Sequence, residues 1–328
     1  MEHFTDYASV VADRFLGSDD LVVEIGCNDG LLLRQFDDDI RTIGIEPAKN
    51  VAEVAETEHG LNIRNSFFSA DVALDIVDSH GTAAAVLANN VVGHLDDLHD
   101  LMLGIKTLIG DNGIFIMEVP YLVDLIHDVT FDTIYHEHLS YFAVRPLQQL
   151  ANQFDMEVFD VDRIDTQGGS IRLYLQPETG PYPKCRYVDD LMILERAMGL
   201  NDSDTFDAFA NNVEFFRVQL RSILTDIRDI GGKIVGYGAP AKGNVLLNYC
   251  NLGGEMIEFL VDTTPAKQQR FAPGTGIPVH PPERFNEELP DYALLLAWNY
   301  ADTILKNEHE FRGQGGRFII PQPSVDLV

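Results

Sequence analysis

One short stretch of this sequence concentrates side chains that can move protons. Tyr135, His136, Glu137 and His138 follow one another directly. Histidine is the side chain whose ordinary pKa suits a general base near neutral pH, and a neighbouring carboxylate can orient it. On an extended backbone His136 and His138 would face the same side, as two metal ligands do, but no third ligand is evident nearby. The stretch is therefore a candidate for proton transfer without a bound metal; the alternatives are a metal site and a polar loop that satisfies its own hydrogen bonds.

A glycine turn near the N-terminus could hold a cofactor. An apolar run over 21–25 leads into Gly26-Cys27-Asn28-Asp29-Gly30, and a second run ends at Glu46 roughly 20 residues later, where an acid can reach a ribose. The glycines let the backbone turn tightly and approach a ligand. The spacing E-x-G-x-x-x-G differs from the dinucleotide fingerprint and leaves room for an amino-acid moiety. It resembles the first motif of class I S-adenosylmethionine methyltransferases; the alternative is an ordinary turn between a strand and a helix.

The predicted cofactor is S-adenosylmethionine, and the position of each residue in the predicted site suggests which part of the cofactor it binds. The backbone at Gly26 and Gly30 approaches the ligand. The methionine end is lined by Glu24, Cys27 and Asn28, the ribose by Glu46 and Pro47, and the sulfonium by Asn89 and Asn90, which end the fourth strand. An aromatic ring after the third strand, Phe67 or Phe68, stacks on the adenine unless both rings belong to the core.

Two further regions are candidates for binding substrate. Glu118 ends the strand over 113–119, and Gly169 and Arg172 lie in the run from Gln167 to Arg172; the alternatives are a satisfied strand-end acid and a glycine bend. A second glycine turn, over 236–244, opens a helix whose N-terminus attracts anions. Its candidate ligands for a pyrophosphate are Gly238, Lys242 and Asn244. This turn could also belong to a scaffold without a ligand, or to a nicotinamide dehydrogenase, since Asp262 ends the next strand.

These side chains need a framework in which strands alternate with helices. Apolar runs predict strands over 21–25, 42–45, 62–64, 83–88 and 113–119, with helices between them. Their apolar character predicts a parallel sheet covered on both faces, with an antiparallel end over 157–164 and 170–175. A helical stretch over 187–230, interrupted near Gly199, leads to strands over 233–238, 257–261, 277–279, 293–297 and 317–320. The predicted fold class is α/β, with a Rossmann-like methyltransferase domain over 1–180, a helical connector over 181–231 and a second Rossmann-like domain for substrate over 232–328.

Composition limits the classes of partner. The 328 residues include 52 acidic and 23 basic ones, which gives a formal net charge of -29. This charge argues against nucleic acid and anionic lipid as partners, because both attract basic patches. The sequence shows no membrane span, no signal peptide and three cysteines without a C-x-x-C pair, so we expect a cytoplasmic protein without disulfides. Dispersed aspartates with only seven lysines favour a solvated anionic surface, as in organisms that live in high salt.

Longer strings relate the sequence to a known family. It contains Tyr-His-Glu-His-Leu-Ser-Tyr-Phe, VVEIGCNDG, GIEPA, ANNVVGHLDD, IMEVPYL, QGGSIRLYL, GYGAPAKGN and FLVDTTPAKQ. These strings resemble those of the sugar C-methyltransferases that act on nucleotide-linked 4-keto deoxysugars. The resemblance implies a class I methyltransferase domain followed by a second Rossmann-like domain. That family normally begins with a small cysteine-rich zinc domain, which has no counterpart here, so we expect one wall of the substrate pocket to be missing or supplied by a partner subunit.

The resemblance also implies a mechanism. Methyl transfer to carbon needs an enolate, because a C–H bond is not nucleophilic. His138 is expected to remove the proton next to the ketone, with Glu137 orienting it or sharing that role, while Tyr135 and His94 donate hydrogen bonds to the enolate oxygen. The alternatives are an O- or N-methyltransferase, which needs no such base, and a non-catalytic α/β binding protein. Because an acidic protein that binds an anionic nucleotide sugar must concentrate its few cations, we expect Lys242, Arg172 and Lys267 near the substrate.

Overall fold

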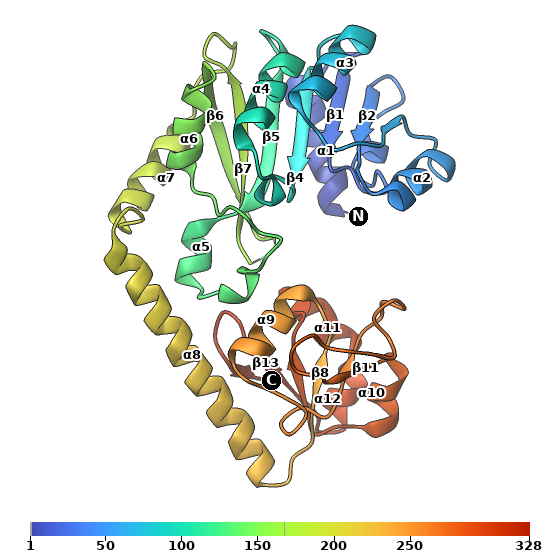
Figure 1. Cartoon of the computed structure of the whole chain (residues 1–328), viewed down its shortest axis with the longest axis vertical. Coiled ribbons are helices and arrows are strands. Elements are labelled where there is room, and N and C mark those ends of the chain that lie inside the picture. The colour runs from blue at the N-terminus through green and yellow to red at the C-terminus, as the bar shows by residue number, and fades with distance from the viewer. Residues whose placement is uncertain (1, 167) are drawn as a thin grey trace. The chain divides into compact units, whose positions relative to one another are not determined.

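The computed structural model describes residues 2–166 and 168–328 (Figure 1). The chain forms two compact units. The first unit takes the residues up to Leu122 together with Leu139–Asp165 and Gly169–Ala197. The second unit takes Val123–His138, Thr166, Gly168 and Met198–Val328. The domain boundaries after residues 180 and 231 stay a prediction, and the compact units differ from them because 123–138 packs with the C-terminal part of the chain.

The first unit is built on a mixed sheet. Within the described residues its strand order is β3-β2-β1-β4-β5-β7-β6, and the pairings of β7 with β5 and with β6 are antiparallel whereas the others are parallel. The strands are β1 (Leu21–Ile25), β2 (Arg41–Ile45), β3 (Ile63–Arg64), β4 (Ala85–Asn89), β5 (Ile114–Pro120), β6 (Met156–Ile164) and β7 (Ser170–Pro177). The helices are α1 (Glu2–Phe15), α2 (Lys49–Thr57), α3 (Ala70–His80), α4 (Leu98–Ile109), α6 (Val144–Asn152) and α7 (Arg186–Ala197). The predicted parallel sheet with an antiparallel end is therefore confirmed.

Packing in the first unit follows the alternation of strand residues. Tyr7 and Val11 of α1 pack against Val22, Leu87 and Ile116, which come from three neighbouring strands. Because successive side chains of a strand point to opposite faces, these residues form one face of the sheet, and α1 covers it. This burial explains why β1 and β4 consist almost wholly of apolar residues.

A buried carboxylate ties two helices of the first unit together. Glu195 of α7 is 2% exposed. Its Oε1 atom accepts from the amide of Val144 at 2.6 Å and from the hydroxyl of Tyr121 at 2.9 Å, and its Oε2 atom accepts from the amide of Arg145 at 2.9 Å. The N-terminal amides of α6 have no partner within their own helix, so Glu195 supplies the cap that the local sequence lacks.

The second unit repeats the Rossmann-like plan. Its strand order is β10-β11-β9-β8-β12-β13-β14 among the described residues. The strands are β8 (Ile234–Tyr237), β9 (Leu260–Val261), β10 (Arg270–Phe271), β11 (Pro278–His280), β12 (Tyr292–Leu295), β13 (Arg317–Ile320) and β14 (Asp326–Leu327). The helices are α5 (Leu122–His127), which the chain enters from the first unit, α8 (Ser203–Asp229), α9 (Ala241–Tyr249), α10 (Glu283–Glu288), α11 (Ala301–Asn307) and α12 (His309–Gly313). The α/β fold class predicted from the sequence is confirmed for both units.

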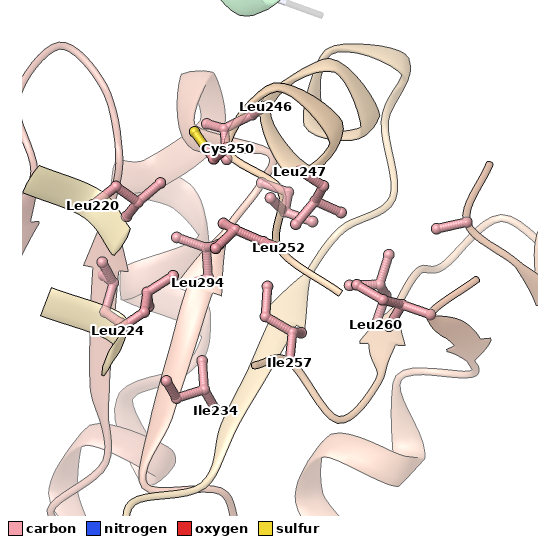
Figure 2. Packing of buried hydrophobic residues seen from close by; sticks show 14 of the residues in the cluster. Leu220, Leu224, Ile234, Leu246, Leu247, Cys250, Leu252, Ile257, Leu260 and Leu294 are labelled. Carbon is pink, nitrogen blue, oxygen red and sulfur yellow. The ribbon is translucent and has the colours of Figure 1, made fainter. Parts of the chain in front are cut away.

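Both faces of the second sheet are covered. Ile234 and Leu294 pack with leucines of α8 and α9, and Figure 2 shows their side chains converging. The alternate residues Val235 and Leu295 pack on the other face with Phe285 and other aromatic rings. This two-sided burial is what a parallel sheet requires, and it explains the uninterrupted apolar runs of the sequence.

Of two predicted helical stretches, one differs from the structure and the other agrees with it. The helix expected after Gly30 is a single 3-10 turn, η1 (Leu33–Gln35). Three aspartates at 37–39 follow it, and negative charge is unfavourable at the C-terminal end of a helix. The predicted interruption near Gly199 is confirmed, since α7 ends at Ala197 and Gly199 has a positive φ of 68°. None of the described helices is long and apolar enough to cross a membrane.

Candidate cofactor and catalytic sites

The turn after β1 has the left-handed backbone that its glycines allow. Gly26, Asn28 and Gly30 have φ angles of 70°, 53° and 78°. The amide of Gly26 donates to the carbonyl of Ile45 at 2.8 Å, which draws the turn against the end of β2. A side chain on Gly30 would collide with Leu61, so this position requires glycine for packing as well as for conformation.

Glu46 holds the turn in place from the end of β2. Its Oε2 atom accepts from the amide of Asn28 at 3.1 Å, and its Oε1 atom accepts from the amide of Ala48 at 2.8 Å. Asn65 fixes the same corner by donating to the main-chain carbonyl of Glu46 at 2.7 Å, while Pro47 is exposed. A carboxylate has about four acceptor positions. Glu46 therefore keeps acceptor capacity for hydroxyl groups of a ligand.

Two side chains on neighbouring strands carry buried polar atoms that make no hydrogen bond of good geometry among the described residues. Glu24 of β1 is 5% exposed, and its Oε2 atom makes no hydrogen bond. Burial raises the pKa of Glu24 to about 8, while Asn89 at the end of β4 lowers it. Both side-chain polar atoms of Asn89 are also buried without a hydrogen bond. Buried polar groups normally have partners, so this pair fits a ligand with hydrogen-bond donors, such as an amino-acid ammonium group.

Four other predicted cofactor residues differ in their exposure to solvent. The side chain of Cys27 lies in the core against Gly44 of β2, and burial raises the pKa of its thiol to about 12. Only the backbone of Cys27 is then part of the turn. The ring of Phe68 packs on Gly104 of α4, whereas Phe67 is 76% exposed. Of the two rings, Phe67 is the one available for stacking. Asn90, whose φ is 54°, is exposed where the chain turns after β4.

The Tyr-His-Glu-His stretch folds around a hydrogen bond of His138. The Nδ1 atom of His138 lies 2.6 Å from the carbonyl oxygen of Thr133. A carbonyl oxygen only accepts, so Nδ1 carries a proton and the neutral ring has its lone pair on Nε2. The ring of Tyr135 lies 4.3 Å from that of His138, and burial and the neighbouring Glu137 raise the pKa of Tyr135. His136 and Glu137 are exposed.

His94 lies in the first unit, beside the point where the chain returns from the second. It ends the 3-10 turn η2 (Val92–His94), and its side chain is exposed. The carbonyl of the preceding Gly93 accepts from the amides of Leu139 and Ser140 at 2.8 and 3.2 Å. The residue that follows His138 along the chain is therefore anchored next to His94.

Glu118 and Arg172 bind each other. Their side chains form an ion pair of 2.9 Å and are 2% and 9% exposed. The guanidinium lies 3.6 Å from the centre of the Tyr7 ring, which stacks on it. The carbonyl of Gly169, the neighbouring candidate, accepts from the amide of Tyr121 at 3.1 Å, and Gln167 is outside the described residues. The pair matches the satisfied strand-end acid that was the alternative to substrate binding.

The second glycine turn reproduces the hydrogen bonds of the first. Gly238 has a φ of 86°, and its amide donates to the carbonyl of Val261 at 2.8 Å. Asp262 accepts from the amides of Ala239 and Thr264 at 2.7 and 2.8 Å, as Glu46 does in the first unit. These amide bonds lower the pKa of Asp262 against the opposing effect of its burial. Lys267, one of the cations expected near substrate, lies 3.2 Å from the same carboxylate.

Lys242 differs from the other predicted cations because none of the described acidic side chains is in hydrogen-bond contact with it. Its Nζ atom is buried, makes no hydrogen bond, and lies 4.2 Å from the centre of the Trp298 ring. Burial lowers the pKa of Lys242 to about 8, an effect that the nearby Asp132 opposes. Asn244 donates to the carbonyl of Pro240 at 3.3 Å, and its Oδ1 atom is buried without a partner.

Three residues in contact with these sites were not predicted from the sequence. Asp132, Thr133 and Trp298 come together only in the folded chain, and the Asp132–Trp298 hydrogen bond joins positions 166 residues apart. A hint was available in Trp298, the single tryptophan of the sequence, but nothing marked its partner. Among the described residues, no group of three or more His, Cys, Asp or Glu side chains could hold a metal ion.

Comparisons with known proteins cover both units. Residues 2–161 match the family model described as a methyltransferase domain, and residues 165–323 match the C-methyltransferase C-terminal domain. The chain is 38% identical to the C-methyltransferase NovU of Streptomyces niveus over 330 residues, which covers 100% of this chain and 78% of the relative.

Solved structures resemble part of the chain. One is the magnesium protoporphyrin IX methyltransferase of Synechocystis PCC 6803 with bound SAH, with a TM-score of 0.41 and 13% identity over 54% of this chain and 82% of that one. Another is the N-methyltransferase NodS of Bradyrhizobium japonicum, with a TM-score of 0.40 and 11% identity over 54% of this chain and 95% of that one.

Proposed function

This chain belongs to the C-methyltransferase family, and from that premise we propose that it methylates the carbon next to the ketone of a nucleotide-linked keto deoxysugar. The observation that carries the proposal is the hydrogen bond from Nδ1 of His138 to Thr133, which leaves the ring in the tautomer that a base requires. Because the chain belongs to the C-methyltransferase family, the two alternatives, an O- or N-methyltransferase and a non-catalytic binding protein, are not proposed.

The methyl donor is S-adenosylmethionine, which supplies an electrophilic methyl group when it is bound. Its methionine end would be held by Glu24 and Asn89, whose buried polar atoms lack partners in the described structure. Its ribose would be held by Glu46, which keeps acceptor capacity beyond its two amide bonds. The turn at Gly26 and Gly30 offers backbone to the ligand without the bulk of a side chain.

Proton removal falls to His138 in this proposal. The ketone makes the neighbouring C–H bond acidic, and the lone pair on Nε2 takes the proton while Nδ1 stays bound to the carbonyl of Thr133. The resulting positive ring is stabilised by the same carbonyl, and the exposed carboxylate of Glu137 adds negative charge in the same loop.

Stabilisation of the enolate oxygen falls to Tyr135 and His94. The raised pKa of Tyr135 keeps its hydroxyl protonated and therefore able to donate a hydrogen bond. His94 is anchored through Gly93 to the residue after His138, so the two histidines are linked by a short, hydrogen-bonded path of backbone. Such preorganised donors usually contribute most of the electrostatic stabilisation in enolate chemistry.

Recognition of the nucleotide is assigned to the second glycine turn. Lys242 is the cation that no side chain there neutralises by direct contact, and the N-terminus of α9 adds a positive dipole end. Gly238 and Asn244 belong to the same turn and first helical turn. Arg172 is a weaker candidate for binding substrate, because its guanidinium already forms an ion pair with Glu118.

The experiment that tests the function is a product analysis. Purified protein is incubated with S-adenosylmethionine and a panel of nucleotide-linked keto sugars, and products are analysed by mass spectrometry and NMR. A product heavier by one methylene, with the new methyl group on the carbon beside the ketone, is the expected result. A methyl group on oxygen or nitrogen, or no product from any keto sugar, would contradict the proposal.

A further inference from the structure

The segment that carries His138 is built into the second unit. The main part of that unit begins at Met198, about 60 residues after the end of the segment 129–138. The carbonyl of Val129 accepts from the buried side chain of Gln322 at 3.1 Å. The ring of Phe131 lies 5.4 Å from that of Phe216 and 5.0 Å from that of Tyr249, and it belongs to the apolar core of the unit.

Asp132 is the polar anchor of this segment. Its side chain is fully buried, and its Oδ2 atom accepts from the indole nitrogen of Trp298 at 2.7 Å. Burial raises the pKa of Asp132 to about 6, and the indole bond and Lys242 oppose that rise. The next residue is Thr133, whose carbonyl accepts from His138. A single peptide therefore separates the anchor from the acceptor that sets the tautomer of His138.

Trp298 is itself fixed, so the anchor is rigid. A side chain on Gly168 would lie 2.7 Å from the edge of the indole, which means that the Gly168 backbone packs directly on it. Lys242 lies over the ring at 4.2 Å, and Trp298 is 6% exposed. With neighbours on the edge and the face of the ring, the indole N–H has one direction in which to point.

We propose that Asp132 and Trp298 are positioning residues for the proton-removal step. They hold the Thr133 carbonyl, and through it the imidazole of His138, in a fixed place relative to the second unit. This inference rests on the proposed role of His138 as the base. It gives the second unit a part in catalysis that is separate from binding the nucleotide, because its single tryptophan orients the base.

The test uses three variants and separates proton removal from methyl transfer. Trp298→Phe removes the indole donor and keeps an aromatic ring, Asp132→Ala removes the acceptor, and Asp132→Asn keeps an acceptor oxygen without the charge. Each protein is incubated with S-adenosylhomocysteine and a nucleotide-linked 4-keto deoxysugar in deuterium oxide. Mass spectrometry then measures the incorporation of deuterium on the carbon next to the ketone. Because S-adenosylhomocysteine has no methyl group to transfer, this rate reports proton removal alone.

If Asp132 and Trp298 position His138, the three variants should differ in their rates of deuterium exchange. Deuterium exchange falls on the order of 10²-fold in Asp132→Ala and about 10-fold in Trp298→Phe, as misplacement of a catalytic group does. Asp132→Asn exchanges close to the wild-type rate. The affinity for S-adenosylhomocysteine stays unchanged in all three variants, because neither residue binds the cofactor in this proposal. Because Asp132 and Trp298 both lie near Lys242, exchange is compared at saturating sugar nucleotide, where a change in its KM has no effect on the rate.

A second readout does not depend on activity. Trp298 is the only tryptophan, so the emission of the whole protein reports its surroundings. Emission of Asp132→Ala shifts to longer wavelength, while that of Asp132→Asn keeps the wild-type position. If Asp132→Asn loses as much exchange as Asp132→Ala, the hydrogen-bond role is overturned, and the same follows if Trp298→Phe exchanges at the wild-type rate.

Tyr237→Phe is the matched control for general damage to the second unit. It removes another partly buried aromatic hydrogen bond, from the Tyr237 hydroxyl to Glu308 at 2.6 Å, and lies in the cluster with Phe285 on the other face of the sheet. It is expected to exchange at the wild-type rate; a loss equal to that of Trp298→Phe overturns the positioning role. Exchange that persists in His138→Asn refutes the base assignment itself, whereas loss there with full exchange in Trp298→Phe refutes only this inference.

Discussion

The Nδ1 atom of His138 and the carbonyl oxygen of Thr133 are 2.6 Å apart. This contact fixes which ring nitrogen holds the proton before any substrate arrives. It also makes the base dependent on backbone geometry, since a carbonyl cannot move without its neighbours. Orientation of a histidine by a fixed acceptor is a recurrent way to keep one nitrogen ready for proton transfer.

His138→Asn should remove the base and leave the loop intact. The asparagine amide can still donate to the Thr133 carbonyl, but it has no group at the place of Nε2. Methyl transfer should fall on the order of 10²- to 10⁴-fold, the range for loss of a general base. Steady-state rates measure the loss, and calorimetry with S-adenosylhomocysteine should give wild-type affinity. His136→Asn, which changes the exposed neighbouring histidine, is the control; a rate near wild type in His138→Asn would exclude the assignment.

Binding of S-adenosylhomocysteine should release a proton through Glu24. The folded-state pKa of about 8 lies above the ordinary value of 4.5, so between these pH values the folded protein holds a proton that the unfolded chain has lost. The contribution of Glu24 to stability therefore falls as the pH rises through this window. An ammonium group next to Glu24 favours the carboxylate and drives the proton off.

Calorimetry in buffers of different ionisation enthalpy measures the protons released near pH 7. Glu24→Gln keeps the shape of the side chain and cannot ionise, so the release should vanish in that variant. Equal release in the wild type and in Glu24→Gln would show that another group is responsible.

Binding of an anionic substrate should take up a proton at Lys242. Burial lowers the pKa of this amine from 10.5 to about 8, so above pH 8 the free protein holds it largely neutral. An anion favours the charged amine and raises its pKa again, so the KM for the sugar nucleotide should increase as the pH rises above 8. Initial rates across this pH range measure the effect. Lys242→Met should raise the KM at every pH and remove the dependence, whereas Lys233→Met, at an exposed lysine, should behave as wild type.

Removing one partner of the Glu118–Arg172 pair should destabilise the first unit. Both side chains are buried, and Arg172→Met leaves the Glu118 carboxylate without its guanidinium. Loss of one member of a buried pair typically costs about 3–5 kcal/mol. Denaturant unfolding of Arg172→Met, Glu118→Gln and the double variant measures the coupling between the two. Additive losses in the double variant would mean that the two charges do not depend on each other.

Glu195→Gln should loosen the start of α6. The amide can replace one carboxylate oxygen as an acceptor but presents N–H groups to the other donor, at Val144 or Arg145. A buried amide left unsatisfied costs about 1–3 kcal/mol. Hydrogen exchange of the Val144 and Arg145 amides should speed up relative to the rest of the first unit. Unchanged protection of these amides would show that Glu195 is not their cap.

The sequence predicted the parts of the fold that depend on local pattern. Apolar runs marked the parallel strands because both faces of each sheet are covered. The glycine turn at Gly26 and the acid at Glu46 were recognisable because their spacing reflects one strand, one turn and one connection. The short turn at Leu33–Gln35 was harder to predict, since the leucines favour a helix and the aspartates after it do not.

The sequence could not predict contacts between residues that lie far apart along the chain. The pattern could not tell that Cys27 turns into the core while its backbone forms the turn, because both depend on the packing of Gly44. Nor could it pair Asp132 with Trp298, since no periodicity links positions so far apart. The roles of the remaining candidate residues stay predictions that the variants above test.

The placement of 129–138 within the second unit has a consequence for how such enzymes can be recombined. A hybrid made by joining two relatives at Met198 would take this segment from one parent and its supporting helices and tryptophan from the other. The Phe131 ring would then meet a foreign core, and Asp132 a foreign indole. An active hybrid should therefore need either matching residues at these contacts or a second crossover, so that residues 123–138 come from the same parent as the C-terminal part. The two units therefore cannot be exchanged independently at a single junction.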